Sequence, residues 1–138
     1  MQEVKWVEKS PVFGDMVRTK VKFYYHYGIF VSESEVIQFG LPNDPTTSSA
    51  QQIRVLSTDV LTFLQGGDLE VMVPDRAACK TKRTPEQIVA IARQRIGEGG
   101  YDILHNNCEH FVNDCVFGQH HSTFLYGVRE KLRQKLGK

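Results

Sequence analysis

One cysteine in this sequence stands among residue types that could make it reactive. Cys108 lies in the stretch YDILHNNCEHFVNDC (residues 101–115), between two asparagines and a Glu-His pair. A thiolate is the reactive form of cysteine, and a helix N-terminus or a nearby histidine lowers the pKa of a thiol. If a helix begins near Asn107, its unpaired N–H groups favour a thiolate and can stabilise the oxyanion formed when a carbonyl is attacked. The pattern therefore indicates a nucleophile, with a buried structural thiol as the alternative.

Among the five histidines, His26 is the candidate base that a predicted element holds in place. It opens a β-rich run that the loop 32–34 separates from a second such run, in the pattern of a hairpin. With a three-residue loop, Gly28 opposes Gln38, so that His26 and Gln38 are diagonal neighbours on one sheet face. Gln38 could then orient His26 toward Cys108, as the third member of a triad does. A two-residue loop would place Gln38 on the opposite face.

The first half of the chain is expected to supply strands, a surface loop and a short helix. Short β-rich runs bounded by turn residues predict strands at 15–21, 26–31, 35–39, 53–56 and 69–73. Two prolines and several Ser, Thr and Asn residues predict a surface loop at 41–52. A short helix is expected within 57–67, capped by Ser57 or Thr58 and followed by two glycines. Cys79 falls in a predicted linker.

The second half of the chain is expected to be helical. Residues 84–87 (TPEQ) form a capping box with proline at the first helical position, and helical spacing continues to Gly97. Residues 108–117 predict a second helix, whose inward side chains are Phe111, Val112, Cys115 and Val116. Leucines and a valine share one face of residues 122–138, with cations elsewhere, which predicts an amphipathic helix. The pattern is one α+β domain over residues 1–121 with a cationic helix after it.

Composition narrows the classes of protein. With 138 residues, 41% hydrophobic and 24% charged, the chain suits one globular domain. A net charge of +1 without a basic stripe gives no indication of nucleic-acid binding. No apolar run of 18 residues predicts a membrane-spanning helix, and no basic start followed by an apolar stretch predicts a secretion signal. Three cysteines without a CxxC pair favour reduced thiols, and we expect a cytoplasmic protein, peripheral at membranes if the tail docks there.

Two motifs resemble a known family. The run His26-Tyr27-Gly28-Ile29, followed much later by NCEHFVN at 107–113, is similar to the lecithin retinol acyltransferase family. That family belongs to the NlpC/P60 superfamily and includes the phospholipase/acyltransferases once called HRAS-like suppressors. The resemblance covers roughly residues 11 to 118 and includes Gly14-Asp15 and Tyr24.

The resemblance implies a fold, a reaction and a set of residues. The fold is a circularly permuted papain-like α+β domain, with an antiparallel sheet packed against helices and the nucleophile at a helix N-terminus. Cys108 would take an acyl group from a phospholipid as a thioester after activation by His26. Water, an amine or an alcohol would then accept that acyl group. Tyr24 and Asn107 would support the oxyanion, and the reaction needs no metal or other cofactor.

The sequence departs from this family at three places. Members with lipid activity usually carry a second histidine where this chain has Gln38. The carbonyl oxygen of a glutamine can still orient His26, so we expect activity. Ser32-Glu33-Ser34 replaces the glycine-containing turn typical of the family. Vertebrate members end in a membrane-spanning helix, which this sequence does not contain.

Other interpretations of these residues stay open. One is a cysteine amidase or peptidase of the NlpC/P60 type. Another is a non-enzymatic regulatory module with the same fold, as in some picornaviral 2A proteins, which the glutamine at position 38 would suit. A structural zinc site is disfavoured because Cys108 and Cys115 are seven residues apart, and no CxxC or HExxH motif occurs. The amphipathic tail could lie on an anionic membrane or pack against protein.

Overall fold

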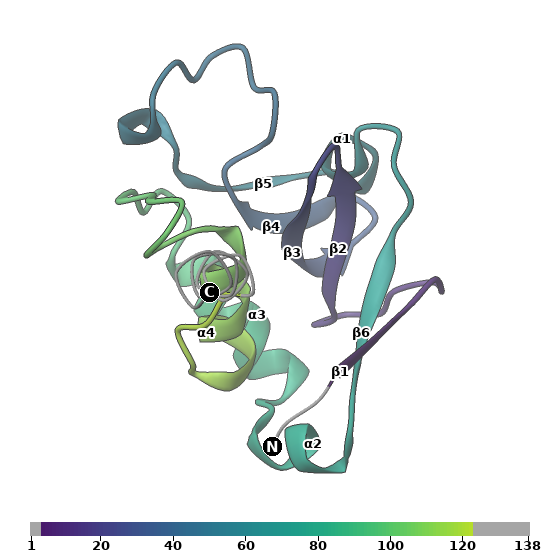
Figure 1. Cartoon of the computed structure of the whole chain (residues 1–138). Coiled ribbons are helices and arrows are strands. Elements are labelled where there is room, and N and C mark those ends of the chain that lie inside the picture. Colours follow the sequence, from purple (N-terminus) through teal and green to yellow (C-terminus); the bar gives the residue numbers. More distant parts are fainter. Residues whose placement is uncertain (1–3, 123–138) are drawn as a thin grey trace, which may run out of the picture.

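A six-stranded antiparallel sheet forms the centre of the protein (Figure 1). The computed structural model describes residues 4–122. The strands are β1 (Val4–Val7), β2 (Met16–Val21), β3 (Tyr24–Ser32), β4 (Glu35–Phe39), β5 (Val55–Thr58) and β6 (Glu70–Pro74). Their order across the sheet is β1-β6-β2-β3-β4-β5, so that the hairpin strands β3 and β4 are neighbours and only β5 lies beyond β4. The fold is α+β, and its antiparallel sheet packed against helices is consistent with the papain-like fold implied by the resemblance.

Helices cover the sheet and fill the connections between strands. They are the 3-10 turn η1 (Ala50–Gln52), α1 (Val60–Leu64), α2 (Arg76–Thr81), α3 (Pro85–Gln94) and α4 (Cys108–Phe117). The predicted capping box of α3 is present: Thr84 Oγ1 accepts from the Gln87 amide, and Gln87 Oε1 accepts from the Thr84 amide. The helix expected at 108–117 has those bounds, and all four side chains predicted to face inward are buried.

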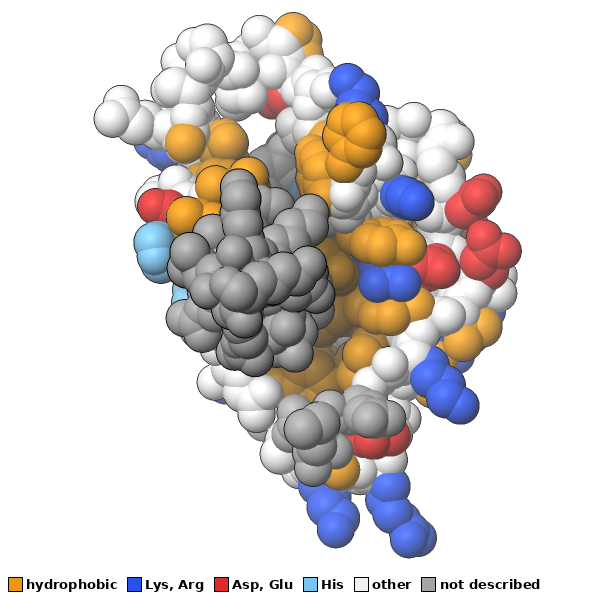
Figure 2. All heavy atoms as spheres, in the orientation of Figure 1, with side chains coloured by type: hydrophobic (Ala, Val, Ile, Leu, Met, Phe, Trp, Pro, Cys, Tyr) orange, Lys and Arg blue, Asp and Glu red, His pale blue; other side chains and the backbone are white. Residues whose placement is uncertain are grey.

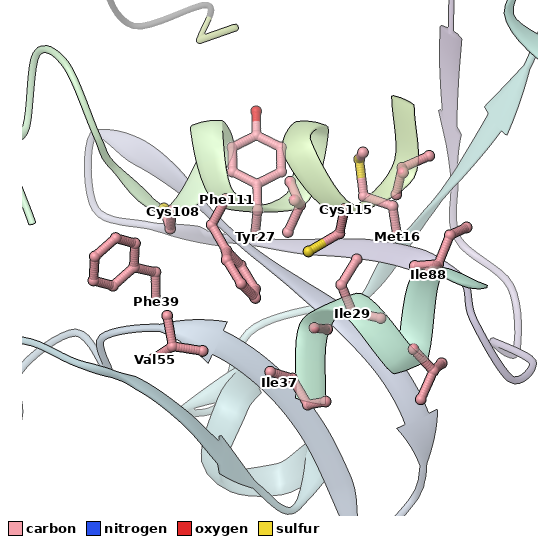
Figure 3. Close-up of a cluster of buried hydrophobic side chains, with 14 of the residues drawn as sticks. Met16, Tyr27, Ile29, Ile37, Phe39, Val55, Ile88, Cys108, Phe111 and Cys115 are labelled. Carbon is pink, nitrogen blue, oxygen red and sulfur yellow. The ribbon is translucent and has the colours of Figure 1, made fainter. Parts of the chain in front are cut away.

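The two faces of the sheet carry different cores. On one face, Tyr27, Ile29, Ile37 and Phe39 pack against α3 and α4, with Phe111 and Cys115 in the same cluster. Figure 3 shows this cluster between the strands and helix α4. On the other face, Phe63 of α1 is buried against residues from β2, β3, β4 and β6. Because side chains alternate along a strand, His26 and Gln38 belong to this second face, where the His26 and Phe63 rings are 5.2 Å apart.

Strands β3 and β4 separate where the candidate residues lie. Their paired residues run from Ser32↔Glu35 to Ile29↔Ile37. Beyond that point β3 pairs with β2 as far as Tyr24, and β4 pairs with β5 as far as Phe39. The strands therefore part at the level of His26 and Gln38, and this parting opens the sheet toward the N-terminus of α4.

The hairpin register was predicted for the wrong reason. The loop is a two-residue turn, Glu33-Ser34, because Ser32 pairs with Glu35. A register shift between Phe30 and Ser32, a β-bulge, leaves Val31 without a direct partner and returns Ile29 to face Ile37. The two-residue turn alone would shift the pairing by one residue relative to a three-residue loop, and the bulge shifts it back. His26 and Gln38 consequently share a face, as expected.

Gly28 lets the second core approach the hairpin closely. A Cβ at this position would come within 2.8 Å of both Phe63 Cε1 and Val36 Cγ1. Such contacts are too short for a side chain, so glycine is needed for Phe63 to pack beneath the strand that carries His26.

Several local expectations were wrong in detail. The cap of α1 is Asp59, whose carboxylate accepts from the Thr62 amide, because residues 57 and 58 extend β5 instead. Cys79 lies in helix α2, capped by Asp75, and not in a linker. Strand β1 was not predicted; it pairs with β6 at the edge of the sheet. The predicted C-terminal helix lies, from residue 123 on, outside the described residues. Within the described part of the chain, no helix has the length and apolar character needed to cross a membrane.

Candidate functional site

Cys108 is the first residue of α4, and Asn107 caps that helix. The side-chain oxygen of Asn107 accepts from the amides of Glu109 at 2.9 Å and His110 at 3.0 Å. His110 Nδ1 in turn accepts from the Asn107 amide at 2.9 Å, which completes a capping box. The first-turn amide that the cap does not use is that of Cys108 itself. The cap thus fixes the thiol at the positive end of the helix.

His26 is held by a chain of hydrogen bonds that runs through Gln38. Gln38 Nε2 donates to the Val36 carbonyl at 3.2 Å and to Thr58 Oγ1 at 2.9 Å, and Thr58 donates to the Asp59 carbonyl. Because the Val36 carbonyl can only accept, this orientation directs Gln38 Oε1 toward His26 Nε2, 2.9 Å away. His26 Nε2 must then carry the proton, which leaves the Nδ1 lone pair free to accept one.

One cavity brings His26 and Cys108 together. It lies where β3 and β4 part, has a volume of about 240 Å³, and we call it the loop cavity. Its lining residues are Tyr24, His26, Phe39, Gly40, Leu41, Pro42, Asn43, Asp44, Thr47, Ile53, Tyr101 and Cys108. The predicted nucleophile and base therefore share a solvent-reachable space, and the loop after β4 supplies its polar wall.

A second and larger cavity reaches the same thiol from another side. It has a volume of about 440 Å³, and we call it the aromatic groove. Its lining residues are Phe23, Tyr24, Tyr25, Tyr27, Tyr101, Ile103, Asn107, Cys108, Glu109 and Ser122. Cys108, Tyr24 and Tyr101 line both spaces, so the thiol lies at the junction of a partly polar cavity and a mainly aromatic one.

Burial keeps the candidate nucleophile and the candidate base neutral. Loss of solvent raises the pKa of Cys108 to about 11; the Glu109 carboxylate adds to this shift, while backbone hydrogen bonds from Tyr27, Cys108 and Glu109 oppose it. Burial also lowers the pKa of His26 to about 4, against the opposing effect of its hydrogen bond to Gln38. The N–H groups of the helix N-terminus do lower the pKa of Cys108, as expected, but desolvation is the larger effect, so the net shift is upward. At neutral pH the site holds a thiol and an imidazole, not an ion pair.

Two tyrosines flank the thiol. Tyr24 is 45% exposed and lines both cavities, so it is not a core residue. Its pKa is raised by partial burial and by the nearby Cys108, so that its hydroxyl keeps a proton to donate. Tyr101, which sequence reasoning missed, packs edge-on against Phe39 at 5.1 Å, and burial raises its pKa as well. The sequence did not indicate this role for Tyr101, because Tyr101 and its neighbour Phe39 are far apart along the chain and meet only where the loop before α4 folds back onto β4.

The remaining predicted residues have structural contacts. The amide nitrogen of Asn107 donates to the Ile103 carbonyl at 2.8 Å and to Ser122 Oγ at 3.0 Å, so Asn107 supports the helix start and has no free donor for an oxyanion. His110 stacks on His120, with ring centroids 4.2 Å apart. Across residues 4–122, no cluster of three or more His, Cys, Asp or Glu side chains could hold a metal ion.

Thr58 is the second residue that the sequence did not reveal. It was considered only as a helix cap, whereas in the structure its hydroxyl accepts from Gln38 and thereby fixes the amide that orients His26. The pairing of Gln38 with Leu56 places Thr58 one strand away on the same sheet face. The contact between Thr58 and Gln38 could therefore be inferred only from the register of β4 and β5.

Comparison with known proteins identifies the family of the chain. The sequence profile of the family described as lecithin retinol acyltransferase matches residues 9–121. Mouse lecithin retinol acyltransferase is 31% identical, in an alignment covering 79% of this chain and 55% of the relative. Human phospholipase A and acyltransferase 3 is 27% identical, covering 79% of this chain and 72% of the relative.

Coverage limits what can be carried over from these relatives. The chain spans about half the length of the lecithin retinol acyltransferases it matches, at 55% of the mouse protein and 54% of the rat protein. The matched segment nevertheless contains the hairpin with His26 and Gln38 and the helix that begins at Cys108. The chain belongs to the lecithin retinol acyltransferase family.

Proposed function

We propose that this protein is a cysteine-dependent acyltransferase and phospholipase A that takes an acyl group from a phospholipid onto Cys108. The observation that carries the proposal is the shared cavity of Cys108 and His26, with His26 Nε2 bonded to Gln38 and its Nδ1 lone pair free. Relatives named acyltransferase and phospholipase A support the same chemistry.

The first half-reaction begins with one proton transfer and one new bond. His26 Nδ1 takes the proton of the Cys108 thiol while the sulfur attacks the ester carbonyl carbon. Because the thiol pKa is about 11 and that of His26 about 4, proton transfer must accompany attack instead of preceding it. The Cys108 amide and the Tyr24 hydroxyl would donate to the oxyanion.

The first half-reaction ends with the departure of the lysophospholipid, and the second half-reaction then releases the acyl group. Collapse of the tetrahedral intermediate breaks the bond to the ester oxygen, and His26 returns its proton to the departing lysophospholipid alcohol. A thioester on Cys108 remains. Water, or an amine or alcohol, then loses a proton to His26 and attacks the thioester, giving a fatty acid or an acylated acceptor and restoring the thiol.

The two cavities suggest where the parts of the donor bind. The aromatic groove, with Tyr25, Tyr27 and Ile103 in its wall, suits the acyl chain. The loop cavity, with Asn43, Asp44 and Thr47, suits the glycerol and headgroup side of the ester. In this arrangement the carbonyl carbon lies at the junction, next to Cys108. Membrane contact through the cationic C-terminal segment stays a prediction.

The experiment that tests the proposal is an intact-mass measurement after incubation with mixed-chain phosphatidylcholine vesicles. We expect a mass increase of one acyl group, removed by hydroxylamine, together with free fatty acid and lysophospholipid in the same tubes. The matched controls are Cys108→Ala, which should show none of these, and Cys115→Ala, which should show all of them. Finding neither adduct nor products with the unaltered protein would contradict the phospholipid proposal and favour an amidase or a non-enzymatic module.

A further inference from the structure

Two tight turns display apolar side chains beside the aromatic groove. Phe23, in the two-residue turn between β2 and β3, is 96% exposed. Ile103 is 56% exposed and Leu104 is also exposed, both in the turn between Asp102 and Asn106. Phe23 and Ile103 line the groove that contains Cys108. Turn positions usually carry polar residues or glycine, so apolar tips at the mouth of a groove indicate a surface for interaction.

Both turns are held in shape by their own hydrogen bonds. The pairing of Val21 with Tyr24 closes the first turn. In the second, the Asp102 carboxylate accepts from the Leu104 amide at 2.9 Å and from the His105 amide at 3.1 Å. This carboxylate is thereby engaged within its turn. The apolar tips are displayed by fixed backbones, which lowers the entropy lost when they bind.

Cations accompany the apolar tips. Lys22 lies in the first turn next to Phe23, and Lys20 pairs with Tyr25, a residue of the groove wall. Both lysines are exposed. Figure 2 shows hydrophobic side chains over the β2–β3 hairpin with Lys and Arg side chains beside them. Apolar tips flanked by lysines match a lipid interface, where acyl chains lie beneath anionic headgroups.

We propose that Phe23, Ile103 and Leu104 insert into the surface of an anionic lipid bilayer, with Lys20 and Lys22 on its headgroups. The groove mouth then faces the acyl chains, and a donor chain can enter without crossing water. This inference rests on the proposed function, because it names the surface at which the phospholipid donor is met. The occupant is the bilayer itself, and a protein partner on the same tips is the competing outcome.

Insertion can be measured without relying on catalysis. In the full chain, Phe23→Trp adds a fluorophore at the proposed tip, and Val12→Trp adds one at the other end of the β2–β3 hairpin, where Val12 is 66% exposed. Vesicles of phosphatidylcholine and phosphatidylserine with brominated acyl chains should quench and blue-shift the Phe23→Trp emission. The Val12→Trp emission should not change beyond the background of Trp6. Equal quenching of both variants, or of neither, would overturn the proposal. If the Phe23→Trp emission were already blue-shifted before vesicles are added, the tip would be covered by protein, which would also overturn it.

Kinetics separate this inference from the proposed function. Leu104→Asp should lower turnover of vesicle phospholipid by about tenfold, since an inserted leucine is replaced by a charge. Turnover of a short-chain, water-soluble phospholipid should stay unchanged, because Leu104 does not line either cavity. Lys22→Glu should weaken binding to anionic vesicles by about fivefold or more. An equal loss on both substrates, or no loss on vesicles, would overturn the inference. An inactive unaltered protein that still inserts its tip would contradict only the proposed function.

Discussion

The first and third turns of helix α4 each carry a buried cysteine, and only one of them has the setting of a nucleophile. Burial raises the pKa of Cys108 to about 11 and that of Cys115 to about 12. Cys115 has no exposed surface and packs among Phe111, Ile29 and Ile88 in the core. Figure 3 shows Cys115 within the cluster and Cys108 at its edge, near Phe39.

The difference between the two cysteines lies in access and in a proton acceptor. Cys108 lines two cavities, and His26 lines one of them with Nδ1 free. Cys115 is instead close to Arg95 and Arg83, which lower its pKa but cannot accept a proton. The pKa of a resting thiol therefore does not identify the nucleophile in this protein. In the mechanism we propose, the feature that distinguishes Cys108 is a histidine placed to take its proton during attack.

The largest expected effect comes from removing each thiol in turn. Cys108→Ala should lower acyl transfer by about 10⁴-fold or more, because the atom that forms the thioester is lost. Cys115→Ala should leave the rate within about threefold and cost about 1–2 kcal/mol of unfolding free energy, since it removes one buried atom from the core. Initial rates and denaturant midpoints measure both. Comparable losses of rate in the two variants would remove the distinction drawn between them.

The next largest effect should come from His26. His26→Ala should slow thioester formation by about 10³-fold, because attack by a neutral thiol then lacks its proton acceptor. Alkylation by iodoacetamide at neutral pH should slow at Cys108 in this variant. Alkylation of Cys115 in protein unfolded by denaturant gives the reference for an unassisted thiol. If Cys108 reacted at the same rate with and without His26, the imidazole would have no part in activating it.

Much of this arrangement could be predicted from local sequence. The capping box of α3, the bounds of α4 and the inward face of that helix follow from spacing and capping residues, and they were confirmed. Such features depend on neighbours within one or two turns of helix. The shared face of His26 and Gln38 was also predicted, but the turn and the β-bulge each differed from the expectation and cancelled.

Features set by the whole fold could not be predicted. The raised pKa of Cys108 depends on how completely sheet and helix exclude water, which no short segment encodes. Thr58 reaches Gln38 from the neighbouring strand, and Tyr101 reaches the thiol through a loop that folds back on β4. These two contacts need the register of β4 with β5 and the path of the chain before α4.

A third prediction uses the pH dependence of stability to compare the base with the thiols. The pKa of His26 falls to about 4 in the folded state from 6.5, so the unfolded chain binds more protons between these values. Stability should therefore be complete above pH 6.5 and fall by about 3 kcal/mol as pH drops toward 4. His26→Gln should remove most of this loss of stability at acid pH, to which the lowered pKa of His110 contributes in the same direction.

The thiols affect the alkaline limb of the same curve of stability against pH. Their pKa values are raised from 9.0, so the stability they contribute is complete below pH 9 and is lost as pH rises toward 11. Cys115→Ala should flatten this alkaline limb without changing the acid one. Urea midpoints across the pH range measure both limbs, and an acid limb that is undiminished in His26→Gln would show that another group causes it.

The smallest effects should come from the residues that orient the base. Gln38→Leu leaves the His26 Nε2 proton without its acceptor, and we expect kcat to fall by about tenfold with little change in KM. Thr58→Val keeps the shape but removes the hydroxyl that fixes Gln38, so a fall of about threefold is expected. Gln38→His, which restores an acceptor, should recover most of the rate. A loss that appeared in KM, or one that Gln38→His failed to recover, would indicate that Gln38 shapes the cavity and does not orient His26.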